Sequence, residues 1–95
     1  MALEAQEKNL RGLGFDARWC LIDLGETAEA VAKAALEDKQ YDVVLIGAGV
    51  RMPLAYLALF EKLINIVHKY APKSRICFNT KPDDTTEAIL RWMAP

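Results

Sequence analysis

The chain has 95 residues, of which 53% are hydrophobic, and its formal net charge at pH 7 is −1. This length predicts a single domain over residues 1–95, and the balanced charge gives no basic surface of the kind that binds nucleic acid. The apolar fraction is slightly above the usual range for globular chains, so we expect more apolar surface than a small core can bury.

The first part of the chain predicts a helix, a strand and a second helix. Residues 2–13 place leucines at helical spacing and end in a glycine-containing segment. Residues 15–23, FDARWCLID, alternate apolar and polar side chains, which is typical of a half-buried strand at a sheet edge. Residues 26–39 return to helical spacing, and there Glu29 and Lys33 are placed to form an i,i+4 ion pair.

The rest of the chain continues this alternation. Residues 42–48, DVVLIGA, are apolar without a period of two, as in a strand buried on both faces of a parallel sheet. A long helix is predicted from Pro53 to about Tyr70, because proline is well tolerated in a first helical turn. Residues 74–80, SRICFNT, predict a third strand, and residues 85–93 predict the last helix, with Ile89, Leu90 and Trp92 or Met93 facing the sheet.

This order of elements predicts an α/β fold. We expect three layers, with a short parallel sheet of about three strands and helices on both faces, similar to a flavodoxin or Rossmann fold without its first strand. Without that strand, residues 42–48 would be unpaired on one side, so we expect the strand near Trp19 to pair directly with the strand near Leu45. Thr80 is the expected N-cap of the last helix, with Asp83 completing a capping box.

The loops that follow the three predicted strands should meet at one edge of the sheet, where ligands bind in open parallel sheets. Their polar groups and glycines make this edge the candidate ligand-binding site. The residues that we assign to it are Asp23, Gly47, Gly49, Arg51, Asn79 and Thr80.

The loop GAGVRMP resembles a dinucleotide-binding loop only in part. Gly47 and Gly49 match the first two glycines of G-x-G-x-x-G, but Met52 stands at the third position and no acidic residue ends the next strand. We therefore expect no nucleotide cofactor. A small phosphate-like or nucleotide-like anion is the alternative ligand, held by the backbone near Gly49 and the side chain of Arg51.

Two resemblances to known families support the predicted fold. The segment YDVVLIGAGVRMP, residues 41–53, resembles the third strand and following loop of response-regulator receiver domains, with Met52 and Pro53 matching their Met-Pro pair. Gly47 stands where those domains carry the phospho-acceptor aspartate, so the resemblance implies the fold without the chemistry. The stretches LIGAGVRMP, LFEKLINIVHKYAP and ICFNTKPDDTTEAILRW are similar to small uncharacterised bacterial α/β proteins of flavodoxin-like shape, which implies a fold and no activity.

The remaining reactive side chains predict no catalytic centre and no metal site. Cys20 and Cys77 lack the spacing of a zinc site or a redox pair, and we expect two buried, reduced thiols in a cytoplasmic protein. His68 shares a helical stripe with Glu61 and Asn65, which we interpret as a solvated face. The N-terminus has no signal-peptide pattern, and no apolar segment reaches the length of a membrane span.

The strongest functional signal is the apolar character of the predicted long helix. Residues 54–60 are apolar at seven consecutive positions, whereas a helix on one face of a sheet needs only an apolar stripe. We therefore expect a homodimer that acts as a non-catalytic binding or interaction module. The alternative is an enzyme or sensor that binds the small anion. The residues expected in the dimer interface are Tyr56, Leu59, Phe60 and Leu63.

Overall fold

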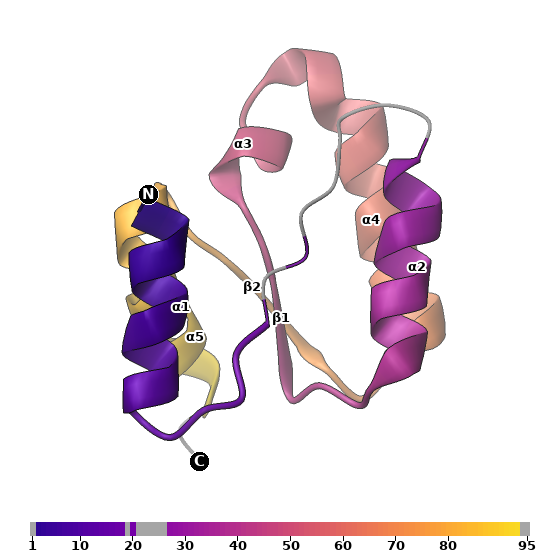
Figure 1. Ribbon diagram of the computed structural model, residues 1–95. Helices are drawn as coiled ribbons and strands as arrows, with labels where there is room; N and C mark the ends of the chain where they lie inside the picture. Colours follow the sequence, from indigo (N-terminus) through magenta and orange to yellow (C-terminus); the bar gives the residue numbers. More distant parts are fainter. Residues whose placement is uncertain (1, 19, 21–26, 94–95) are drawn as a thin grey trace.

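Two parallel strands lie at the centre of the structure, with helices on both sides (Figure 1). The computed structural model describes residues 2–18, 20 and 27–93. Strand β1 (Val43–Ile46) pairs with β2 (Arg75–Phe78) in parallel, from Val43 opposite Arg75 to Ile46 opposite Phe78. In chain order the helices are α1 (Ala2–Gly12), α2 (Ala28–Asp38), α3 (Ala48–Arg51), the 3-10 turn η1 (Leu54–Tyr56), α4 (Leu57–Tyr70), the 3-10 turn η2 (Pro82–Asp84) and α5 (Thr85–Met93).

The helices cover the sheet in two layers. Figure 1 shows α1 and α5 together on one side of the strands and α2 and α4 on the other. Helix α5 packs directly on both strands, and α4 reaches the sheet through Phe60, whose ring meets that of Phe78 edge to face at 5.9 Å. The buried apolar side chains come from both layers and both strands: Leu10, Ala28, Ile46, Leu63, Val67, Ala71, Cys77 and Ala88. The expected α/β class and helices on both faces are therefore confirmed.

The third strand expected near the N-terminus does not form in the part of it that the structure describes. Residues 15–18 and Cys20 adopt no regular secondary structure, while Trp19 and residues 21–23 lie outside the described residues. The pairing expected between Trp19 and Leu45 therefore lies outside them too. In the described part of the chain the sheet has two strands, and the three-stranded, flavodoxin-like arrangement is not confirmed.

The segment after α1 is held by its polar side chains instead of by a strand ladder. Arg11 Nη2 donates to the carbonyl oxygen of Ala17 at 2.7 Å, and Lys39 forms an ion pair with Asp16. In the described part of this segment, Phe15 and Ala17 are half-buried while the charged Asp16 and Arg18 are exposed, as the alternating sequence predicted. The alternation of apolar and polar residues therefore predicts which of these side chains point inward, even though the described backbone here forms no strand.

The long helix predicted from Pro53 begins as the 3-10 turn η1 and becomes α-helical only at Leu57. Helical turns begin before the proline, at α3, and stop at Arg51; Met52 keeps helical angles, whereas Pro53 itself is extended, with φ −68° and ψ 126°. The extended Pro53, which cannot donate a backbone hydrogen bond, separates α3 from η1. Helix α4 then continues to Tyr70, which confirms the predicted end.

Two other expected helical contacts differ in the structure. Glu29 pairs with Lys62 of α4 at 3.1 Å rather than with Lys33, because α2 and α4 lie side by side. On α5, Leu90 and Trp92 are exposed to 40% and 47%, although both were candidates for the sheet-facing side. Ala88 is the residue that α5 buries completely, and Leu90 lies about 200° around the helix from it.

None of the helices within the described residues has both the length and the apolar character that crossing a membrane requires.

Candidate functional site

The carboxyl ends of β1 and β2 lie next to each other, and the structure brings the loops that follow them into contact through Asn79. The Asn79 side chain is only 2% exposed. Its Oδ1 accepts a hydrogen bond from the backbone N–H of Ala48 at 2.8 Å, and its Nδ2 donates to Thr85 Oγ1 at 3.0 Å. The prediction that the polar residues at this edge lie close together is therefore correct for the loops after β1 and β2.

Arg51 lies over the end of β2 and is engaged by the protein itself. Its Nη2 donates to the carbonyl oxygen of Asn79, and its guanidinium carbon is 5.5 Å from the centre of the Phe78 ring. Its Nε is buried and has no hydrogen-bond partner within the described part of the chain. Arg51 thus joins α3 to the end of β2, and its buried Nε–H is a donor without a partner in the described residues.

The backbone N–H and the hydroxyl of Thr80 are bonded to a carboxylate four residues further on, which is about one helical turn. Asp84 accepts hydrogen bonds from the backbone N–H of Thr80 at 2.9 Å and of Lys81 at 3.3 Å, and also pairs with the Thr80 hydroxyl. The expected capping box is shifted by one residue, because Lys81 and not Thr80 is the N-cap of the 3-10 turn η2, so the carboxylate three positions further on is Asp84 rather than Asp83. The hydrogen bond from the Thr80 hydroxyl is the main reason that the pKa of Asp84 is lowered.

The expected anion site is therefore largely filled by contacts within the protein. The Ala48 N–H, which would face an anion at the start of α3, donates to the Asn79 side chain. Arg51 donates one hydrogen bond to the backbone carbonyl oxygen of Asn79. Gly47 has an ordinary φ of −71°, and among the described residues nothing lies within 4 Å of a Cβ added at Gly47 or Gly49. These glycines make no close approach to a neighbour there. Asp23, the remaining residue assigned to this site, lies outside the described residues.

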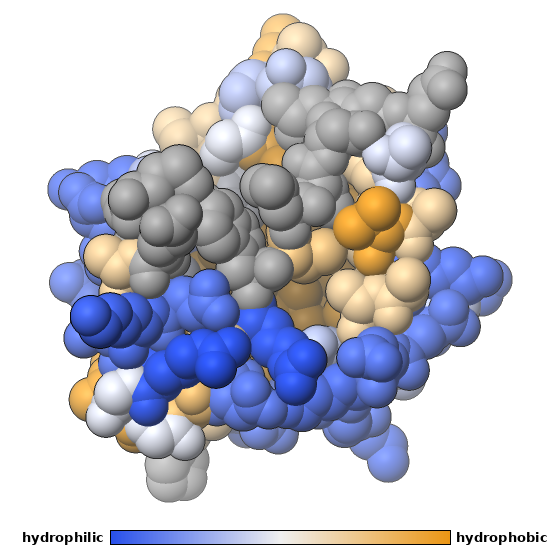
Figure 2. Space-filling view, viewed as in Figure 1, coloured by the Kyte–Doolittle hydropathy of each residue, from blue (hydrophilic) through white to orange (hydrophobic). Residues whose placement is uncertain are grey.

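The segment that follows α3 exposes large apolar side chains to solvent. The exposed fractions are 65% for Met52, 84% for Leu54 and 48% for Leu57, and we call these three residues the apolar tip. The segment between α3 and α4 lies at the upper end of the molecule in Figure 1, and Figure 2 shows hydrophobic atoms at the surface there. Exposed leucine and methionine side chains clustered in this way are more typical of an interaction surface than of a ligand pocket.

Of the four residues expected in a dimer interface, none is among the large hydrophobic side chains that the structure leaves exposed. Leu63 is only 6% exposed and belongs to the core, and the Phe60 ring packs against that of Phe78. Tyr56 and Leu59 are half-buried. The sequence correctly predicted that this segment has more apolar surface than the domain buries, but it did not show which side chains stay outside. The Met-Pro-Leu sequence was the available signal, because proline ends helices and Pro53 stands, extended, between α3 and η1.

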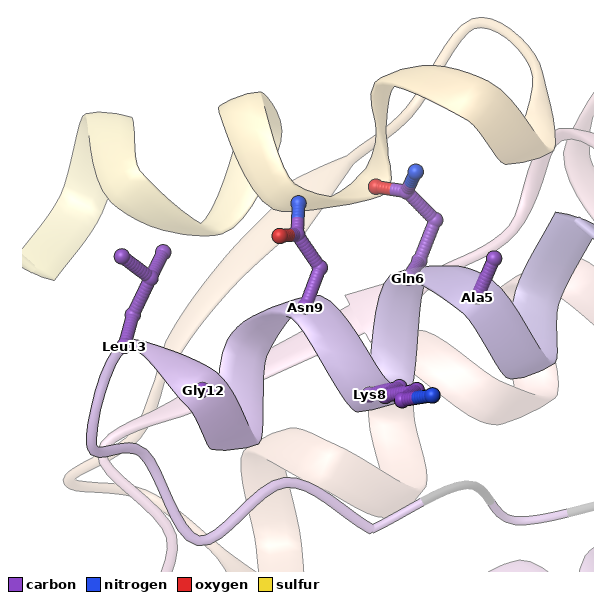
Figure 3. Close-up of a pocket in the computed structure, with 6 residues that line it drawn as sticks. All are labelled: Ala5, Gln6, Lys8, Asn9, Gly12 and Leu13. Atoms are coloured by element: carbon purple, nitrogen blue, oxygen red, sulfur yellow. The ribbon is translucent and has the colours of Figure 1, made fainter.

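Two open depressions lie on the surface formed by the described residues. One open depression, of about 600 Å³, runs along α1 and is shown in Figure 3. Within it, the side chains of Gln6 and Asn9 point towards α5, where Gln6 Oε1 accepts hydrogen bonds from the N–H and hydroxyl of Thr86. A second depression lies beside α4, where Lys62 pairs with Glu29. Gln6 in the first depression and Lys62 in the second are therefore engaged in contacts between helices.

The two cysteines have different environments, which corrects the expectation that both are buried. Cys77 is 1% exposed, and burial raises the pKa of its thiol to about 11 against the opposing charge of Arg91. Cys20 is exposed. It lies on the polar side of the alternating segment, so its outward position agrees with the alternation. Over the described residues, no three His, Cys, Asp or Glu side chains are grouped as a metal site would need.

No protein-family model, curated protein sequence or solved structure matches the chain.

Proposed function

We propose that this protein is a non-catalytic interaction module that forms a homodimer through its apolar tip. The observation that carries this proposal is the exposure of Met52, Leu54 and Leu57 on a segment whose base is firmly bonded to the sheet. A domain gains nothing in its own stability from leucine side chains left in water, whereas a partner that covers them recovers the hydrophobic free energy.

A second copy of the chain is the partner that fits this surface. The net charge is −1, so two copies repel each other only weakly as they approach. Stable interfaces bury about 800 Å² on each partner, and their centre is apolar while their rim is polar. The apolar tip supplies such a centre, and the charged outer face of α4, with Glu61 and Lys62, supplies a rim.

Sedimentation velocity on wild type and two matched variants tests the dimer. Leu54→Glu places a charge on the apolar tip and should convert the dimer to a folded monomer, whose melting temperature no longer depends on protein concentration. Leu13→Glu is the control, because Leu13 is also exposed, at 57%, but lies at the far end of α1 (Figure 1). A wild type that stays monomeric at 100 µM, or a Leu54→Glu variant that associates as tightly as wild type, would show that the proposal is wrong.

Binding of a small phosphate-like anion beside Arg51 is the second candidate function. It is favoured by Arg51 Nε, a buried donor without a partner in the described residues, because buried donors normally find an acceptor. Calorimetric titration with inorganic phosphate and with a nucleoside triphosphate tests it on the wild type and on Arg51→Ala. Arg91→Ala serves as the control, since Arg91 donates to the Phe78 carbonyl oxygen. Heat of binding that survives in Arg51→Ala would place the anion elsewhere.

A further inference from the structure

Asn79 is a buried polar residue that is bonded to the segment leading to the apolar tip. It directly follows β2 and is 2% exposed. Burying an amide costs free energy unless its hydrogen bonds are satisfied, so the hydrogen-bond partners of Asn79 indicate its structural role. Those partners lie in the loop after β1 and at the start of α5.

The side chain of Asn79 acts as an N-cap for α3, although it comes from another strand. The first N–H groups of a helix have no partner within that helix. Gly47, at the N-cap position of α3, has no side chain to bond them. Asn79 Oδ1 takes this role and accepts from Ala48 N–H at 2.8 Å across 31 positions of sequence.

The orientation of the Asn79 amide is determined from its other side. Its Nδ2 donates to Thr85 Oγ1 at 3.0 Å, and that hydroxyl donates in turn to the carbonyl oxygen of Pro82 at 2.8 Å. Since Nδ2 can only donate, Oδ1 must face Ala48. Thr85, at the start of α5, therefore orients the Asn79 amide, whose oxygen caps the start of α3.

The backbone of Asn79 holds the other end of α3. Its carbonyl oxygen accepts from Arg51 Nη2, and the Arg51 guanidinium stacks over the Phe78 ring. Both the first and the last residue of α3 are thus bonded to Asn79. Met52 follows α3 directly, and Leu54 comes two residues later, after the conformationally restricted Pro53.

We propose that Asn79 is the positioning residue of the apolar tip. By bonding both ends of α3, it sets the direction in which Met52 and Leu54 leave the sheet edge, and it does so without being part of the contact surface. This inference rests on the proposed function, in which the apolar tip is the dimer interface. In this proposal Asn79, at the end of β2, supports partner binding by orienting the apolar tip, and no ligand is needed.

Three variants test this role by amide hydrogen exchange and by the dimer dissociation constant. Asn79→Ala removes the cap of α3, so exchange should speed up over residues 48–57 and the dimer should weaken about tenfold. Asn79→Asp retains an oxygen that can accept from Ala48 N–H, and the Thr85 hydroxyl can turn from the Pro82 carbonyl to donate to its other oxygen, so this variant should restore most of the affinity. Gln6→Ala is the control, because it removes two hydrogen bonds from buried Thr86 and leaves both bonds between Asn79 and α3 in place.

The positioning role is supported if Asn79→Ala changes both readouts, Asn79→Asp restores them and Gln6→Ala changes neither beyond its effect on global unfolding. It is overturned if residues 48–57 exchange as slowly in Asn79→Ala as in Gln6→Ala, or if the Asn79→Ala dimer is as tight as wild type. A monomeric wild type would refute the proposed dimer instead. In that case the exchange rates over residues 48–57 still decide whether Asn79 holds this segment.

Discussion

At the scale of single residues, the polar groups at the strand ends mainly bond one another. Asp84 is an example, because its carboxylate accepts hydrogen bonds from Thr80 and Lys81 in the turn before α5. The hydrogen bond from the Thr80 hydroxyl contributes most to lowering the pKa of Asp84, and desolvation opposes it. A carboxylate with a lowered pKa stabilises the folded state in its ionised form.

This linkage predicts a pH-dependent contribution of Asp84 to stability. The contribution is complete above the pKa of an unfolded aspartate, about 3.9, and is lost as the pH falls through the lower folded-state pKa. Asp84→Asn should therefore lower the urea midpoint at pH 7, and its difference from wild type should shrink at pH 3. Asp83→Asn, at the exposed neighbouring carboxylate, should have little effect at either pH. A difference for Asp84→Asn that is equally large at pH 3 and pH 7 would contradict this account.

At the scale of elements, α1 is attached to α5 through polar bonds as well as through the buried Leu10. Gln6 Oε1 accepts from Thr86 N–H at 2.9 Å and from Thr86 Oγ1 at 2.7 Å, and Asn9 Nδ2 reaches the same hydroxyl at 3.5 Å. Thr86 lies in the first turn of α5, where backbone N–H groups have no partner in their own helix. Gln6 therefore supplies a cap from a neighbouring helix.

Removing this cap should destabilise the whole domain. Gln6→Ala leaves the buried Thr86 groups without an acceptor, and we expect the free energy of unfolding to fall by about 1–3 kcal/mol. Equilibrium urea unfolding measures this difference. Lys8→Ala is the comparison variant, since Lys8 lies on the same helix but points away from α5 in Figure 3. Equal losses in the two variants would mean that the Gln6 contacts contribute nothing specific.

At the scale of the whole molecule, the deepest part of the core is the short sheet between two pairs of helices. Cys77 lies on β2 and is 1% exposed, whereas Cys20 is exposed in the segment after α1. A thiol reacts as its thiolate, and burial raises the pKa of Cys77 to about 11. Cys77 is therefore shielded both by the surrounding side chains and by its protonation.

Thiol labelling should therefore report on global unfolding. With a disulfide reagent at pH 8, Cys20 should react rapidly in the native protein, and Cys77 should react only at the rate at which the domain opens. Addition of urea beyond the unfolding midpoint should make both thiols reactive. A Cys20→Ser variant isolates the slow phase, and rapid native-state labelling in that variant would show that the core around β2 is open.

The sequence alone determined the local structure of this protein well where the pattern is long and periodic. The helices at residues 2–13 and 26–39, the end of α4 at Tyr70 and the parallel pairing of the apolar strands were all predictable, because hydrophobic periodicity and helix-ending residues act over a few neighbouring positions. The gathering of the loops after β1 and β2 at one edge was also predictable, because it follows from parallel strand order.

The tertiary structure alone decided what those loops do. Asn79 and Ala48 are 31 residues apart, and no local pattern shows that an amide on one strand caps a helix after the other. The same holds for Leu63, which is buried, and Leu54, which is exposed, although both are leucines of one apolar segment. Burial depends on which surfaces the packed elements leave uncovered, and hydrogen-bond partners depend on distances in space. Neither quantity is contained in the spacing of residues along the chain.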